Sequence, residues 1–248
     1  VDDRVLRTVV SHLESINLNK TDLDVKGVAF EQFMDGFFKG DFGQYFTPRP
    51  IIEFAVKMMK PEHDWDVLDP ACGSGGFLLH ALDYMRSQAS EYYDKDTVDY
   101  FNYWHDFASK HLYGIEINDE IARVAKMNMI VHDDGHTNVI SFDALDSIDK
   151  MHDHNRGFEA GKFDLILTNP PFGSTITKAE KPYLANYELG KTKDAKGKYK
   201  DRPRQSSEIL FIERIWEFLK PGTGKAAIVL PDGVLTNSSA QYVRDFIL

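Results

Sequence analysis

The 248-residue sequence predicts an α/β fold built around a doubly wound, mostly parallel sheet. From residue 66 onward, short apolar runs that fit β-strands alternate with longer amphipathic segments that fit helices. This alternation is typical of parallel βαβ units. The chain is long enough to bury a large core, and its single cysteine, Cys72, excludes an internal disulfide framework. One large domain with a small appendage accounts for the length.

The expected elements follow from apolar periodicity and from turn residues. Strands are expected at residues 66–70, 112–118, 139–145, 163–169 and 224–235. Helices are expected at residues 1–17, 25–39, 47–60, 75–87, 119–132 and 206–220, the third of them with Thr47 as N-cap. Segment 88–111 is interpreted as an inserted helix or loop, and segment 173–205 as a long loop.

The charge of the chain is negative overall but positive in one segment. The formal net charge of −10 argues against nucleic-acid binding over the whole surface. Residues 191–204, with the sequence KTKDAKGKYKDRPR, carry an excess of lysine and arginine over aspartate. This segment fits either a phosphate contact or a solvated loop, and the sequence leaves both interpretations open.

Other features concern location and metals. No apolar stretch approaches the ~20 residues of a membrane span, and the N-terminus lacks the pattern of a secretory signal. Together with the single cysteine, this predicts a cytoplasmic protein. The chain begins at Val1, so we expect a piece of a longer protein. Histidines occur in HDDGH (132–136) and MHDHN (151–155), but without the spacing of metal ligands, so no metal site is expected.

The first expected strand runs directly into the sequence DPACGSGGF at residues 69–77. Gly73, Gly75 and Gly76 allow a tight turn and a close approach of the backbone to a ligand, and a helix follows at once. A glycine cluster alone also fits a simple turn. Its position between a strand and a helix favours a ligand site.

Acidic residues lie at the ends of the next two expected strands, Glu116 in GIEIN and Asp143 in SFDAL. Because parallel strands present their carboxyl ends at one edge of the sheet, both acids are expected beside the glycine turn. A carboxylate suits a ribose diol at the first position and an exocyclic amino group, such as that of adenine, at the second. Because acids line the expected site and no phosphate-binding lysine follows the glycines, an adenosyl ligand is favoured over a phosphate ligand. Either acid alone would also fit an exposed strand end.

The fourth expected strand ends in LTNPPFGS at residues 167–174. The side-chain oxygen of Asn169 and the carbonyl oxygen of Pro170 can both accept from one amino group, which would aim the nitrogen lone pair at an electrophile. Phe172 offers a ring against which a planar base can stack. A strand ended by proline, with a packed phenylalanine, is the alternative interpretation.

Taken in order, DPACGSGGF, GIEIN, SFDAL and LTNPPF resemble the S-adenosylmethionine-binding and catalytic motifs of N6-adenine DNA methyltransferases. The stretch GQYFTPRPI (43–51) resembles their additional cofactor motif, and its position ahead of the glycine motif matches the gamma arrangement. The resemblance covers nearly the whole chain and is greatest to the modification (M) subunits of type I restriction-modification systems. It implies a Rossmann-like class I methyltransferase fold, with a helical N-terminal segment at residues 1–42 and a catalytic core at residues 43–248 that is incomplete at its C-terminus.

The resemblance also implies a role for each matching residue. The methionine end of S-adenosylmethionine would be lined by Tyr45, Phe46 and Thr47 and enclosed by a turn of Asp69, Ala71, Gly73 and Gly75. The ribose hydroxyls would bind Glu116, and the cofactor adenine would contact Ile117, Asp143 and Ala144. The flipped target adenine would be held by the catalytic residues Asn169, Pro170, Pro171 and Phe172.

The implied reaction is direct displacement of the sulfonium methyl group by adenine N6, after the base has been flipped out of double-stranded DNA. A specificity (S) subunit would supply sequence recognition, and a restriction (R) subunit is a further implied partner. Methyltransferases of RNA or of protein glutamine are the nearest alternatives, but they commonly carry tyrosine at the place of Phe172 and lack the upstream GQYFTPR. A cofactor-binding subunit that is inactive without its specificity partner is the other alternative.

Overall fold

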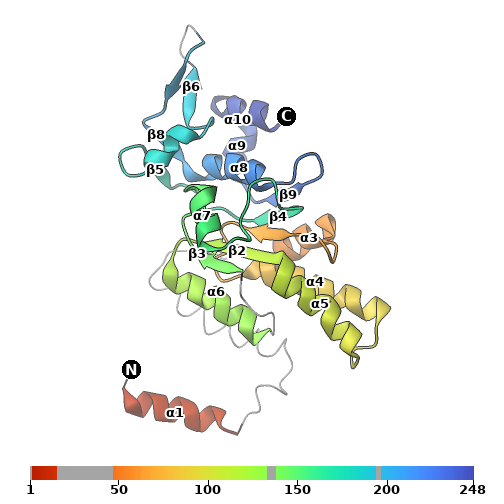
Figure 1. Cartoon of the computed structure of the whole chain (residues 1–248). Helices are drawn as coiled ribbons and strands as arrows, with labels where there is room; N and C mark the ends of the chain where they lie inside the picture. The colour runs from red at the N-terminus through yellow and green to blue at the C-terminus, as the bar shows by residue number, and fades with distance from the viewer. Residues whose placement is uncertain (1, 16–46, 133–137, 194–196) are drawn as a thin grey trace.

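The computed structural model describes residues 2–15, 47–132, 138–193 and 197–248 (Figure 1). Its centre is a five-stranded sheet with the strand order β3-β2-β1-β4-β9, in which all neighbouring pairs are parallel. The strands are β1 (Val67–Asp69), β2 (Leu112–Glu116), β3 (Val139–Ser141), β4 (Leu165–Thr168) and β9 (Lys225–Ile228). The order reverses direction beside β1, which confirms the predicted doubly wound fold.

Helices cover both faces of this sheet. Figure 1 shows α4 (Gly76–Tyr92), α5 (Val98–His111) and α6 (Asp119–Val131) on one side, and α7 (Ile148–His154) and α8 (Ser207–Phe218) on the other. Each layer encloses its own apolar cluster. The two-sided burial explains why the strands are continuous apolar runs rather than alternating ones.

Several expectations about individual elements need correction. Segment 88–111 contains helix α5, one of the two alternatives that the sequence left open, whereas helix α7 was not expected. The fifth strand ends at Ile228, so the expected strand 224–235 is too long. Pro231 cannot donate to a sheet ladder, and it instead precedes the short helix α9 (Asp232–Thr236), which is followed by η2 (Ser238–Ala240) and α10 (Gln241–Ile247).

The long segment 173–205 was expected to be a loop, and this was wrong for about half of it. Strand β5 (Thr175–Thr177) pairs antiparallel with β8 (Arg204–Ser206). Strand β6 (Lys191–Lys193) pairs in the same way with β7 (Tyr199–Asp201). A 3₁₀ turn, η1 (Pro182–Asn186), lies between β5 and β6 along the chain. The segment therefore has its own backbone hydrogen bonds, which the periodicity of such short strands could not reveal.

The N-terminal region is described in part. Helix α1 (Asp3–Leu13) lies within the first expected helix, whereas the expected helix 25–39 lies outside the described residues. Helix α3 (Arg49–Met59) begins one residue later than expected, because Pro48 and not Thr47 occupies its N-cap. Within the described residues, no helix is both long and apolar enough to span a bilayer.

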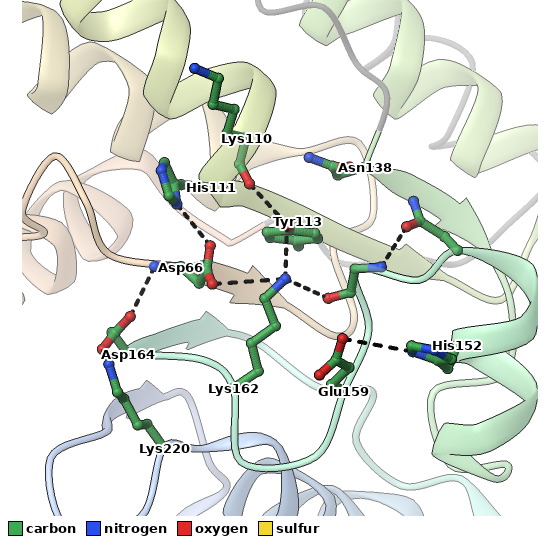
Figure 2. A network of polar contacts seen from close by, with 12 residues as sticks. Asp66, Lys110, His111, Tyr113, Asn138, His152, Glu159, Lys162, Asp164 and Lys220 are labelled. Carbon is green, nitrogen blue, oxygen red and sulfur yellow. Dashed lines mark hydrogen bonds and ion pairs between the residues drawn. The ribbon is translucent and has the colours of Figure 1, made fainter.

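A polar network ties the strands together at their amino-terminal ends (Figure 2). Lys162 Nζ donates to the hydroxyl of Tyr113 at 2.9 Å and to the carbonyl of Gly157 at 2.8 Å, and lies 3.8 Å from the carboxylate of Asp66. The ring of His111 contacts the same carboxylate at 2.8 Å. These contacts connect the starts of β1 and β2 to the loop before β4, on the edge of the sheet opposite the strands' carboxyl ends.

Replacing Lys162 by methionine tests this network. Lys162→Met keeps most of the apolar stem but leaves the Gly157 carbonyl without this donor and removes the positive charge beside Asp66. We therefore expect a loss of about 1–3 kcal/mol in the free energy of unfolding. The matched control is Lys57→Met, which removes an exposed helical ion pair with Glu53 and should change the free energy by under about 0.5 kcal/mol. Urea unfolding followed by circular dichroism measures both. Equal losses in the two variants would contradict a special role for Lys162.

Candidate active site

A pocket of about 910 Å³ opens at the carboxyl ends of the strands. Its size is that of a site for a ligand larger than a single base or sugar. The walls come from the residues that follow β1, β2, β3 and β4, from the start of α3, and from the segment after β4. Stretches that are far apart in the sequence therefore meet around one cavity.

The glycine turn forms one wall of this pocket. Gly73 and Gly75 adopt positive φ angles of 54° and 91°, and Gly75 occupies the N-cap of α4. Left-handed conformations of this kind are accessible to glycine at little cost. The amide of Gly73 points at Glu116 and donates to its Oε2 at 3.1 Å. The turn is thus bonded to the end of the neighbouring strand.

A third glycine, Gly114 in β2, allows the turn to lie close to the sheet. A Cβ atom at this position would lie 2.8 Å from Cδ1 of Leu78 and 3.1 Å from Sγ of Cys72. Cys72 itself is buried, and burial together with the carboxylates of Asp69 and Glu116 raises the pKa of its thiol. Cys72 therefore fits the role of a small packing residue, since a neutral thiol is a weak nucleophile.

Asp69, the last residue of β1, links the turn to the neighbouring strand β4. Its Oδ1 accepts from the amide of Ala71 at 3.0 Å and from the hydroxyl of Thr168 at 2.7 Å. The side chain is almost fully buried, and this burial raises its pKa to about 7. Desolvation outweighs the two hydrogen bonds, which act in the opposite direction.

The two acids predicted at strand ends both line the pocket. Glu116 is buried, and its Oε1 accepts from the amide of Asn118 at 2.8 Å while Oε2 faces the glycine turn. Burial raises the pKa of Glu116 as well. Asp143 accepts from Lys181 and Tyr183, two residues of the segment after β4. Ile117, next to Glu116, is exposed at the pocket and could cover a flat ring.

Asn169 lies at the tip of β4 in a fixed orientation. Its Nδ2 donates to the hydroxyl of Thr47 at 2.9 Å, and its Oδ1 is buried without a hydrogen-bond partner among the described residues. The next residues are held by α8, because Ser207 Oγ donates to the carbonyl of Pro171 at 2.8 Å. Phe172 is 44% exposed beside the pocket. An unsatisfied acceptor at this position is ready to receive an N–H group.

Most of the predicted site residues are brought together, but two cannot be placed. Those lining the pocket are Thr47, Asp69, Ala71, Gly73, Glu116, Ile117, Asp143, Ala144, Asn169, Pro170, Pro171 and Phe172. Gly75 does not line it and serves the first turn of α4 instead. Tyr45 and Phe46 lie outside the described residues. The roles of all of these residues remain predictions.

Sequence reasoning missed several residues of the pocket wall. Lys181 and Tyr183 come from the segment taken for a loop, and no sequence signal marked them. Asn128 had a signal, since it is a polar residue on the buried face of a helix. Its Nδ2 donates to the carbonyl of Ser74 at 3.0 Å, and its Oδ1 has no partner among the described residues. No sequence signal marked Ser207, because its contact with the Pro171 carbonyl depends on where α8 begins.

Known proteins share both the motifs and the fold. A family model described as N-6 DNA Methylase matches residues 21–247. The chain belongs to this family. It is 31% identical to the type I restriction enzyme StySPI methylase subunit of Salmonella potsdam over 79% of this chain, and 30% identical to the EcoEI methylase subunit of Escherichia coli over 93%. These matches span 33% and 41% of the two relatives, so the chain corresponds to well under half of their length.

Among solved structures, the crystal structure of a modification subunit from Vibrio vulnificus YJ016 is similar with a TM-score of 0.73 and 26% identity. The match covers 98% of this chain and 46% of that one. The class I methyltransferase fold predicted from the motifs is therefore confirmed. No cluster of three or more histidine, cysteine or acidic side chains that could hold a metal occurs in the described part of the chain, where MHDHN lies but most of HDDGH does not.

The raised pKa of Asp69 predicts a pH dependence of stability. Between pH 3.8 and about 7 the folded chain keeps a proton on Asp69 that the unfolded chain has released. The free energy of unfolding therefore falls as the pH rises through this window and levels off above it, by an amount on the order of 4 kcal/mol from this group. Asp69→Asn retains an oxygen for Ala71 and Thr168 but does not titrate.

Urea unfolding at pH 4.5, 5.5, 6.5 and 7.5 measures the effect as the difference between the wild type and Asp69→Asn. Glu116 titrates in both proteins, so its contribution cancels to first order. We expect the wild type to lose stability relative to the variant at each step up to pH 7. A constant difference over this range would show that Asp69 is already ionised in the folded chain.

Proposed function

We propose that this chain is the catalytic core of an S-adenosylmethionine-dependent DNA methyltransferase that modifies N6 of adenine, as the M subunit of a type I restriction-modification system. The observation that carries the proposal is the buried Oδ1 of Asn169, which has no hydrogen-bond partner within the described parts of the chain and lies at the edge of an adenosyl-sized pocket lined by Glu116 and Asp143. The family and the relatives support it, since the family model is described as N-6 DNA Methylase and the relatives are methylase subunits of type I restriction enzymes.

The pocket residues fit S-adenosylmethionine by the chemistry of their donors and acceptors. Glu116 offers a carboxylate oxygen for the ribose hydroxyls, and the exposed side chain of Ile117 offers an apolar contact for the adenine ring. Asp143 offers an acceptor for the exocyclic amino group. The turn at Gly73 and the side chain of Thr47 would enclose the methionine end. The cofactor supplies an electrophilic methyl group.

Asn169 and Pro170 would receive the target base. Because Thr47 holds Nδ2, the amide is oriented with Oδ1 as the atom left for an incoming amino group. The carbonyl of Pro170 is restricted in direction because Pro171 follows it, and the bond from Ser207 holds the next carbonyl. Two acceptors on one amino group keep its nitrogen lone pair out of the ring's conjugation and aimed into the pocket. Phe172 would stack on the base.

The partners follow from the same proposal. The formal net charge of −10 disfavours DNA binding by this chain's surface as a whole, which supports a separate specificity subunit for most DNA contacts, with a restriction subunit as a further partner. The described part of segment 191–204 contains the paired strands β6 and β7, and for this basic segment both a phosphate contact and a solvated surface stay open. We place the complex in the cytoplasm, in keeping with the one buried, free thiol at Cys72.

The catalytic role of Asn169 predicts a large loss of activity on its removal. Asn169→Ala deletes the acceptor and its anchor, so transfer of tritiated methyl groups to N6-methyladenine in unmethylated DNA should fall by about 100-fold or more. The protein is assayed with and without a specificity subunit encoded in the same operon. Asn102→Ala, an exposed change on α5, is the matched control and should keep full activity. Label in RNA or in protein glutamine would overturn the DNA assignment, and turnover by Asn169→Ala would overturn the assigned site.

The contact between Thr47 and Asn169 predicts a separation of catalysis from binding. Thr47→Val removes the hydroxyl but keeps the shape, and frees the amide to rotate, so kcat should fall by about 10-fold. Thr47→Ser restores the hydroxyl and most of the rate. Calorimetry of cofactor binding completes the test, because a residue that acted only on the methionine end would raise the cofactor Kd and leave kcat at saturation unchanged.

A further inference from the structure

Two side chains from the segment after β5 meet Asp143 at the pocket. Lys181 Nζ and the hydroxyl of Tyr183 each donate to Oδ2 of Asp143 at 2.9 Å. The other oxygen, Oδ1, accepts from the amide of Leu145 at 3.1 Å. An ionised carboxylate has about four acceptor positions, so one remains on Oδ1. Lys181, Tyr183 and Asp143 all line the pocket itself.

The segment that carries these donors is anchored in the core. Leu184 is fully buried, and the hydroxyl of Tyr187 donates to the carbonyl of Leu145 at 2.7 Å. Arg214 of α8 donates through Nη2 to the same carbonyl at 3.2 Å and to the following carbonyl at 2.9 Å. Both Tyr187 and Arg214 are buried. The loop after β3 is therefore held by its carboxylate on one side and by its carbonyls on the other.

We propose that Lys181 and Tyr183 are positioning residues of the cofactor pocket: they hold Asp143 so that its free acceptor position selects an adenosyl group through the exocyclic amino group. This inference rests on the proposed function and extends it to residues outside the motifs. Lys181 balances the charge of a carboxylate whose side chain is only 18% exposed, and Tyr183 fixes the direction of Oδ2. Oδ1 is thereby turned toward the ligand.

The chemistry of the two donors fits this role. Burial and the adjacent Asp143 carboxylate raise the pKa of Tyr183 well above its usual value, so its hydroxyl remains a donor at working pH. A carboxylate fixed in this way accepts from the amino group of adenine but faces the carbonyl oxygen of hypoxanthine with repulsion. Sites built to bond a polar group reject analogues that cannot complete the bond.

The opposite arrangement would make Lys181 and Tyr183 competitors that the cofactor must displace from Asp143. The buried anchors at Leu184, Tyr187 and Arg214 argue against it, because the segment cannot withdraw without breaking core contacts. The two arrangements also predict opposite changes in affinity. Removing a positioning donor weakens cofactor binding, whereas removing a competitor strengthens it.

The test is calorimetric binding of S-adenosylhomocysteine and S-inosylhomocysteine to the 248-residue chain. We expect the wild type to prefer the adenosyl compound, and Tyr183→Phe to raise the Kd of that compound by about 10-fold with little change for the inosyl compound. Lys181→Met should act in the same direction. The matched controls are Tyr92→Phe on α4 and Lys150→Met, which removes an exposed pair with Asp146 close to Asp143.

A double-mutant cycle shows whether Tyr183 acts through Asp143. In an Asp143→Asn background, Tyr183→Phe should change the Kd less than 2-fold, which a general structural effect would not reproduce. Thermal unfolding checks the fold of each variant, and Lys181→Met carries the test if Tyr183→Phe does not fold, since Lys181 is 42% exposed.

The outcomes separate this inference from the proposed function. Unchanged or tighter binding of the adenosyl compound by both variants, or an undiminished effect of Tyr183→Phe in the Asp143→Asn background, overturns the positioning role and leaves the proposed function intact. A folded wild type that binds neither compound overturns the cofactor assignment and this inference with it.

Discussion

The arrangement of the site depends on the hydrogen bond that the hydroxyl of Thr168 donates to the carboxyl group of Asp69. These residues end the adjacent parallel strands β4 and β1, and the bond between them is 2.7 Å long and buried. Asp69 continues directly into the glycine turn, and Thr168 is followed by Asn169. A bond at this point therefore fixes the distance between the proposed cofactor wall and the proposed target tip. Burial makes the bond costly to leave unmade, since an unpaired polar group at the same place would lose its solvation without compensation.

The tip of β4 is held from two further directions. Thr47, 122 residues before Asn169 in sequence, holds the amide, and Ser207, 36 residues after Pro171, holds the backbone. Each contact removes freedom from the acceptor groups before any substrate arrives. Because these groups lose their conformational entropy during folding, they lose little more when a substrate binds. A rigid supporting layer improves a site in this way. The tip is thus determined by the whole fold rather than by the four residues of its motif.

This explains how much the sequence could predict. The sheet and most of its helices were predictable because apolar runs and glycine or proline breaks are local signals, and the motif residues at strand ends gather because parallel strands share an edge. Thr47 shows the limit: its place before a helix indicated an N-cap, but its hydroxyl bonds to Asn169, a contact that no local pattern contains. The same holds for Lys181 and Tyr183, whose segment has strands of three residues and a 3₁₀ turn, too short for any periodicity to show.

The segment from Phe172 to α8 connects the tip of β4 to Asp143. It leaves the target tip, pairs as β5 with β8 just before α8, and then reaches Asp143 through Lys181, whose own amide donates to the carbonyl of Thr177 at the end of β5. A short, hydrogen-bonded path therefore joins the place proposed for the target base to the place proposed for the cofactor adenine. Because this path is packed against the core at Leu184, a displacement at one end has to be accommodated at the other. If Lys181 positions Asp143 as inferred, the order of the target tip and the affinity for the cofactor depend on the same few hydrogen bonds, and neither can be tuned alone.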